Sequence, residues 1–341
     1  MKKNYFMLAA AVTLFAACAE TDMVEEVNDV NVPQAIGFDA FTNKAVRAEI
    51  NNVADLQNVG FQVWGYKAAT ATPMDWTSQD TIFDNVNVSY DGAWKYVDIK
   101  YWDRTSTYKF YAVAPATPTD VTYSIVPETG MITIDGAKSA ISTASNDYLI
   151  DRDGNLNVNG AYAGTSHDAV NFDFHHIMSK VVFKLKAAVP EEIKVTGLTM
   201  KGWNNGVGKF VQTLTTTPNV ATNDDEWSIA TAAEGNITLV GGSATQATIT
   251  LNEDMSTVSD ITDQYIMVPQ TIDADKLTFT IDFEIDGEKF VAQVGKLATE
   301  QVWGTDAVIT YTISVGPDVI DFDVAKVCNW DNGSKREDEI E

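Results

Sequence analysis

The chain has 341 residues, enough for about two domains, and its 48 acidic and 23 basic side chains give a formal charge of −25. A body this acidic repels phosphate backbones, which excludes nonspecific binding to nucleic acid as a function. Its content of 45% hydrophobic and 10% aromatic residues is too high for a disordered acidic chain, so most of the sequence is expected to fold.

Residues 1–17 have the three parts of a signal peptide. Two lysines stand near the start, an apolar run extends from Tyr5 to Ala17, and that run ends in two alanines. The run is about 13 residues long, whereas a membrane-spanning helix needs roughly 20. Cys18 follows the alanines directly, as in bacterial lipoproteins, and is predicted to be lipidated. An ordinary signal peptide with a chance cysteine is the alternative.

Residues 18–34 are predicted to form a lipidated acidic tether. The stretch 19–32 contains five carboxylates, no basic residue and no aromatic side chain, so it lacks the groups that build a core. If Cys18 carries lipid, Cys328 has no partner for an intramolecular disulfide. Cys328 is then expected to be a small buried hydrophobe.

The sequence after the tether is dominated by alternating apolar and polar side chains. The alternation over Leu277–Ile285 is followed by Asp286-Gly287 and resumes over Phe290–Val294, which predicts a hairpin with one exposed face. No window of eleven or more residues shows convincing helical periodicity. Further strands are predicted at 59–63, 86–90, 94–96, 181–185, 237–239, 247–251 and 309–315.

These patterns predict an all-β fold. Strands punctuated by Gly, Pro, Asn and Asp are typical of β-sandwiches, and the length allows two sandwiches in series. Turn residues interrupt the strand pattern between Asn157 and Phe172. We therefore expect an N-terminal sandwich at 35–165 and a C-terminal sandwich at 166–341.

The residues predict no catalytic site, metal or cofactor. His175 and His176 are adjacent, so on a strand their side chains point to opposite faces and cannot share one metal ion. The stretch Asp151–Asn159 has oxygen-bearing side chains at every second position, a composition that calcium loops favour. Turn residues that bond to their own backbone explain that composition equally well.

Aromatic side chains leave a second interpretation open. If Trp76, Trp102 and Trp203 are exposed, they could form a platform for a sugar ring. Core packing is the commoner use of tryptophan in a sandwich.

Several short motifs follow one another along the chain, and the cysteine that is predicted to be lipidated precedes them. They are Ile36–Phe38, Lys44–Ala48, Phe61–Tyr66, Tyr101–Trp102, Tyr108–Pro115, Phe172–Val181 and Tyr265–Gln270. In this order they resemble the motifs of the fimbrillin family, the lipoprotein pilins of Bacteroidia that include FimA-like and Mfa-like proteins. The resemblance runs from Ile36 to about Trp330.

The resemblance implies two tandem transthyretin-like Greek-key β-sandwich domains, exported as a palmitate-bearing lipoprotein to the cell outer membrane. It implies that an Arg-specific surface protease cuts between Arg47 and Ala48 and so releases the lipid and a removable first strand, residues 35–47. A strand from another fimbrial subunit then fills the open groove. Repeated head-to-tail contacts of this kind build an adhesive surface fimbrium. The implied partners are other subunits, the protease and outer-membrane lipid, with no nucleic acid and no enzymatic activity.

Two stretches have the alternation that such an exchange needs. Ile36 and Phe38 alternate with polar or small residues in the first strand, and Ile320, Phe322 and Val324 do so near the C-terminus. The last residues, 331–341, are strongly charged, which favours a tip or accessory subunit over a shaft subunit. The rival hypothesis is a permanently lipid-anchored surface protein that binds glycans or acts as an adhesin and does not polymerise.

Overall fold

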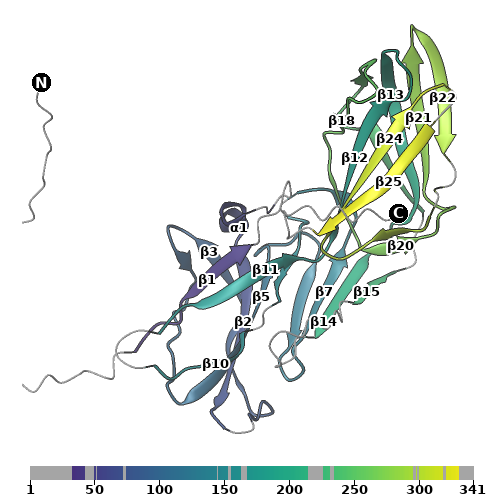
Figure 1. The fold of residues 1–341 in the computed structure, drawn as a ribbon. Helices are drawn as coiled ribbons and strands as arrows, with labels where there is room; N and C mark the ends of the chain where they lie inside the picture. The colour runs from purple at the N-terminus through teal and green to yellow at the C-terminus, as the bar shows by residue number, and fades with distance from the viewer. Residues whose placement is uncertain are drawn as a thin grey trace, which may run out of the picture.

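The computed structural model describes residues 33–42, 50, 52–71, 74–143, 145–152, 155–162, 167–213, 226–230, 234–294, 297, 299–317 and 320–329. Most of these residues lie in strands, which confirms the all-β class (Figure 1). The transthyretin-like Greek-key topology stays a prediction. In this described part of the chain, no helix is long and apolar enough to span a membrane.

A first region is built around an eight-stranded sheet. Its strands are, in spatial order, β1 (Phe38–Thr42), β11 (Val170–His176), β9 (Leu149–Asp151), β5 (Ser106–Ala114), β2 (Phe61–Ala69), β3 (Asp80–Tyr90) and β4 (Trp94–Lys95), with β10 (Asn155–Asn159) beside β5. Every position of β5 is buried, because one core cluster covers each face of the strand. Tyr111 and Val113 point into one cluster, and Phe110 and Ala112 point into the other.

A four-stranded sheet covers one face of this region. Its order is β15 (Glu226–Ile229), β14 (Gly208–Thr213), β7 (Met131–Ala137) and β6 (Thr122–Val126). Ile132 and Ile134 of β7 alternate with polar residues and are fully buried against the larger sheet. This is the burial pattern expected of a sheet with one exposed face.

A second region consists of two larger sheets and a small one. The six-stranded sheet contains β25 (Ile320–Asn329), β24 (Ala307–Val315), β12 (Ser179–Ala187), β19 (Tyr265–Met267) and β8 (Ala140–Ile141), with β18 (Ser259–Asp260) beside β12. The five-stranded sheet contains β16 (Glu234–Val240), β13 (Ile193–Asn204), β21 (Thr278–Ile285) and β22 (Glu288–Val294), with β17 (Ile249–Leu251) beside β13. Strands β20 (Gln270–Ile272) and β23 (Gln301–Trp303) form a separate pair.

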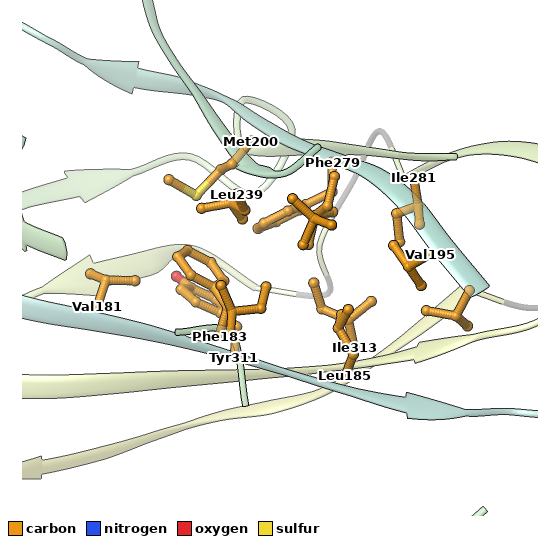
Figure 2. Packing of buried hydrophobic residues seen from close by; sticks show 14 of the residues in the cluster. Val181, Phe183, Leu185, Val195, Met200, Leu239, Phe279, Ile281, Tyr311 and Ile313 are labelled. Atoms are coloured by element: carbon orange, nitrogen blue, oxygen red, sulfur yellow. The ribbon is translucent and has the colours of Figure 1, made fainter. Parts of the chain in front are cut away.

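The core of the second region lies between its two larger sheets. Phe183 and Leu185 of β12 and Ile313 of β24 point toward Val195 and Phe279 on the opposite sheet (Figure 2). All five side chains are almost completely buried. Because burying an aliphatic or aromatic side chain stabilises a fold by about 1.5–3 kcal/mol, this cluster is a main source of the stability of the second region.

Strand pairing crosses the predicted boundary between residues 165 and 166. β11 follows that boundary in sequence but pairs with β1 and β9, and β14 pairs along β7. In the other direction, β8 pairs with β19. Phe210 and Val268 share a core cluster with Tyr111 and Ile134, so burial of these side chains draws the strands together. Sheets in both regions therefore contain strands from both sides of residues 165 and 166, and two domains divided there stay a prediction.

A short helix was not predicted by periodicity. α1 (Val53–Val59) has only seven residues, fewer than the window in which a helical pattern can be recognised. The Asn52 side-chain oxygen accepts hydrogen bonds from the backbone N–H groups of Ala54 (2.8 Å) and Asp55 (3.2 Å), which caps the helix start. Gly60 ends the helix with φ of 65°, and a Cβ there would lie 2.4 Å from the Val88 carbonyl oxygen.

Candidate functional site: the first strand and the C-terminal strand

The first strand lies at the edge of the eight-stranded sheet. β1 pairs in parallel with β11, from Phe38 opposite Val170 to Thr42 opposite Phe174 (Figure 1). The N–H of Val170 donates to the carbonyl of Gly37 at 2.9 Å. Within the described residues, β11 is the only strand that β1 pairs with.

The residues just before β1 pair on the opposite side. The N–H of Ile36 donates to the Lys100 carbonyl (2.8 Å), and the N–H of Trp102 donates to the Gln34 carbonyl (2.9 Å). A β-bridge joins Ala35 to Tyr101 between these two bonds. Residues 34–36 therefore pair with the segment after β4, and residues 37–42 pair with β11 on the opposite side. We call the place that residues 34–42 occupy between these two partners the slot.

The side chains of this segment alternate as the sequence predicts. Ile36, Phe38 and Ala40 are buried, whereas Asp39 is exposed. The ring centroid of Phe38 lies 5.3 Å from that of Phe83 and 5.6 Å from that of Phe172. Close aromatic pairs of this kind add about 0.5–1.5 kcal/mol each to the stability that area burial supplies. Phe38 is thus the main apolar anchor of the segment.

Asp103 stabilises the turn that follows the segment Lys100–Trp102. Its N–H donates to the Tyr108 hydroxyl at 2.6 Å, and its carboxylate accepts from the Thr105 N–H (3.0 Å) and hydroxyl (2.7 Å). The Ser106 hydroxyl (3.0 Å) and the Lys67 ammonium (3.2 Å) also donate to it. These bonds, first among them the one from the Thr105 N–H, hold the pKa of Asp103 well below its usual range.

The substitution Asp103→Asn is expected to destabilise the protein by about 1 kcal/mol at neutral pH, because it removes charge-assisted hydrogen bonds from a partly exposed group. The folded-state pKa of Asp103 is lowered, so the wild-type advantage is complete above the unfolded value of about 4 and disappears as pH falls through the folded value. Urea unfolding at about pH 7 and about pH 2.5 measures this difference. A gap of equal size at both pH values would contradict the assignment. Asp91→Asn, which removes an exposed pair with Lys95, is the matched control with a small expected effect.

The C-terminal strand lies at the edge of the second region. β25 pairs antiparallel with β24, and Ile320 and Phe322 lie opposite the buried Val315 and Ile313. The register shifts between Thr310 and Thr312, so Val324 lies at the irregular part of the ladder. The C-terminal strand therefore pairs within its own chain.

The predicted modification sites lie outside the described residues. These are Cys18, the predicted lipidation site, and Arg47 and Ala48, which flank the predicted cut. The chain is described again at Ile50, eight residues after the end of β1 at Thr42.

No curated protein sequence matches this chain. The model of the fimbrillin-like family matches residues 47–330, well over half of the sequence. The chain belongs to the fimbrillin-like family. Membership makes it a fimbrial or adhesion protein and places it at the cell surface.

This fimbrillin-like chain is also similar to several solved structures, at low identity. A Bacteroides uniformis protein assigned to cell adhesion is 14% identical, with a TM-score of 0.47, over 87% of this chain and 99% of that one. A Bacteroides ovatus protein, also assigned to cell adhesion, is 14% identical to this chain. Its TM-score is 0.46, over 88% of this chain and 99% of that one. The tip fimbrial protein Mfa3 from Porphyromonas gingivalis has 11% identity and a TM-score of 0.37 over 85% and 99%.

A buried hydrogen-bonded pair of side chains anchors the fimbrillin-like body just after the predicted cut. Asp147 and His176 are almost fully buried, and their Oδ1 and Nδ1 atoms lie 2.7 Å apart. The other carboxylate oxygen of Asp147 accepts a hydrogen bond from the N–H of Ile50 at 3.3 Å. No local pattern connects these two residues, because Asp147 lies next to the turn residue Asn146 and 29 residues away from His176.

The other candidate residues serve the fimbrillin-like fold itself. The buried carboxylate of Asp151 accepts hydrogen bonds from the N–H of Asp173 (3.1 Å) and the amide of Asn155 (3.2 Å). No group of three or more His, Cys, Asp or Glu side chains suited to a metal occurs among the described residues.

The three tryptophans do not form a sugar platform. Trp102 and Trp203 are buried in the cores of the first and second regions. The ring of Trp76 covers the ammonium of the buried Lys109, whose Nζ lies 4.2 Å from the ring centroid. The prediction that Trp102 or Trp203 offers an exposed ring face to a sugar is therefore wrong.

Proposed function

We propose that this protein is a non-enzymatic structural subunit of an adhesive fimbrium, exported as a lipoprotein and assembled by donor-strand exchange. Its precursor is held at the outer membrane by lipid on Cys18. An Arg-specific surface protease cuts between Arg47 and Ala48, and the released segment takes the first strand with it. The partners in the polymer are other fimbrial subunits.

The observation that supports this proposal is the pairing of residues 34–36 with Lys100–Trp102 and of residues 38–42 with β11. When the segment leaves, backbone groups of β11 and of Lys100–Trp102 lose their partners, and the rings of Phe83 and Phe172 lose their cover. Unpaired backbone groups beside exposed apolar side chains are costly. A strand from another subunit satisfies both at once, in the manner of β-strand addition.

The C-terminal strand repeats the residue pattern of the first strand. Ile36-Gly37-Phe38-Asp39-Ala40 and Ile320-Asp321-Phe322-Asp323-Val324 share isoleucine, phenylalanine and aspartate at the same spacing. In the proposed register, Ile320, Phe322 and Val324 of the donor take the places of Ile36, Phe38 and Ala40. Because β1 runs parallel to β11, the donated strand enters in that same direction.

The exchange moves the C-terminal strand from one pairing partner to two. Among the described residues, β25 pairs only with β24, so its release breaks a single edge ladder. In the slot, the donated strand pairs with β11 and also with the segment Lys100–Trp102. The donated strand therefore exchanges its ladder with β24 for pairing with β11 and with the segment Lys100–Trp102.

Treating the purified precursor with an Arg-specific protease is expected to give an SDS-resistant ladder of polymers. Arg47→Ala is expected to abolish that ladder by removing the cleavage site. Lys44→Ala, which changes a basic residue in the same segment, is expected to leave it intact. A wild-type protein that stays monomeric after a clean cut at Arg47 would support the permanently anchored rival instead.

A further inference from the structure

Three large apolar side chains are exposed close together on the first region. Val97, Ile99 and Tyr101 have 78%, 52% and 55% of their surface exposed. Single exposed apolar residues are ordinary on a protein surface. Three within five residues of the chain gather exposed apolar surface at one place, and such surface marks an interaction site. We call these three side chains the apolar strip.

The segment that carries the strip is also a wall of the slot. The Tyr96 hydroxyl donates to the Ile36 carbonyl at 2.7 Å, and the Tyr96 ring lies 5.4 Å from that of Phe38. At the other end, Trp102 is buried, and its N–H bonds to Gln34. Residues 96–102 thus contact the first strand and also carry the exposed apolar strip.

The first strand does not cover the strip in the precursor. The exposed fractions of Val97, Ile99 and Tyr101 are those found with residues 34–42 lying in the slot. A donated strand of the same length would leave the apolar strip as exposed as the first strand does. It differs from the first strand because it is attached to the body of a second subunit, which must lie next to the slot.

We infer that the apolar strip is a second contact between subunits, covered by the body of the copy whose strand fills the adjacent slot. This inference rests on the proposed function. Its occupant is a second copy of this chain, because Lys100 and Trp102 pair with whatever strand fills the slot and flank Tyr101 directly. The strip then adds apolar burial to the backbone pairing of the exchanged strand.

The double substitution Val97→Asp/Ile99→Asp tests the strip in the full-length precursor. Both side chains are exposed, so the precursor is expected to fold and to be cut at the wild-type rate. After cleavage, the amount of ladder is expected to fall at least about tenfold, because two carboxylates would be buried against the neighbouring body. The matched control is Met255→Asp/Val258→Asp, two exposed apolar residues of the second region, which is expected to polymerise like wild type.

The outcomes separate the strip from the exchange mechanism. If cleaved wild type and cleaved Val97→Asp/Ile99→Asp give equally strong ladders, the apolar strip is not a contact between subunits. Donor-strand exchange is then unaffected. Absence of a ladder from cleaved wild type overturns both.

If the double variant misfolds, a photo-crosslinking residue at position 99 in the otherwise wild-type chain gives a second measurement. Crosslinks between subunits of the polymer are expected. A polymer that shows no such crosslink overturns the strip.

Discussion

The substitution Phe38→Ala is expected to destabilise the precursor by about 3–5 kcal/mol, the usual cost of truncating a buried phenylalanine. Phe38 is 5% exposed and lies among the rings of Phe83, Tyr96 and Phe172. After cleavage and departure of the first strand, the variant and the wild type are the same molecule. Their processed forms are therefore expected to have equal stability. Denaturant unfolding of both forms measures this difference.

Phe172→Ala is the matched control for this experiment. Phe172 is also fully buried and contacts the Phe38 ring, but it lies on β11 and stays with the body. Its truncation is expected to destabilise the precursor and the processed form alike. If the effect of Phe38→Ala persists after processing, the first strand has not left the slot, and the exchange mechanism is wrong.

A peptide of residues 318–326 is expected to block ladder formation when it is added in excess during cleavage. The peptide contains Ile320, Phe322 and Val324 and fills the vacated slots without bringing a second body. Replacing Phe322 of the peptide by aspartate is expected to weaken inhibition at least about 100-fold, because an unpaired carboxylate would enter the Phe38 pocket. The ladder yield as a function of peptide concentration measures this effect.

A peptide of residues 34–42 supplies the control for the slot itself. It contains Ile36, Phe38 and Ala40, which fill the slot in the precursor, so it is expected to inhibit as well. If this peptide blocks the ladder and the 318–326 peptide does not, the donor is a different strand. If the Phe322→Asp peptide inhibits as strongly as its parent, the proposed register is wrong.

Sequence patterns predict the elements whose conformation depends only on neighbouring residues. The hairpin around Asp286-Gly287 is confirmed as β21 and β22, and both turn residues have positive φ, 49° and 81°. A two-residue turn of this kind requires such angles at both positions and favours Asp-Gly. Ile36 and Phe38 are likewise confirmed as inward-facing residues, because alternation alone decides which face of a strand is apolar.

Features that depend on distant partners could not be predicted. The sequence shows that residues 38–42 suit a strand, but it does not show that Phe38 lies opposite Val170, 132 residues away, in parallel. Both slot walls come from such distant pairings. The buried pair of Asp147 and His176 could not be predicted for the same reason. The alternation of β11 places His176 on the buried face, but no local pattern indicates that Asp147 lies beside it. No sequence pattern indicates that the side chains of the apolar strip are exposed, so their exposure could be seen only in the structure.

The sharing of strands across residues 165 and 166 limits how this protein can diversify. β14 supplies Phe210 to the core of the first region, and β8 pairs within the second. A recombination event that joined the first half of one such gene to the second half of another would place mismatched side chains around Phe210 and Ile134. Because interiors are close-packed, such hybrids are expected to fold poorly. Variation between related subunits should therefore accumulate as surface substitutions, with the whole span from 33 to 329 inherited as one piece.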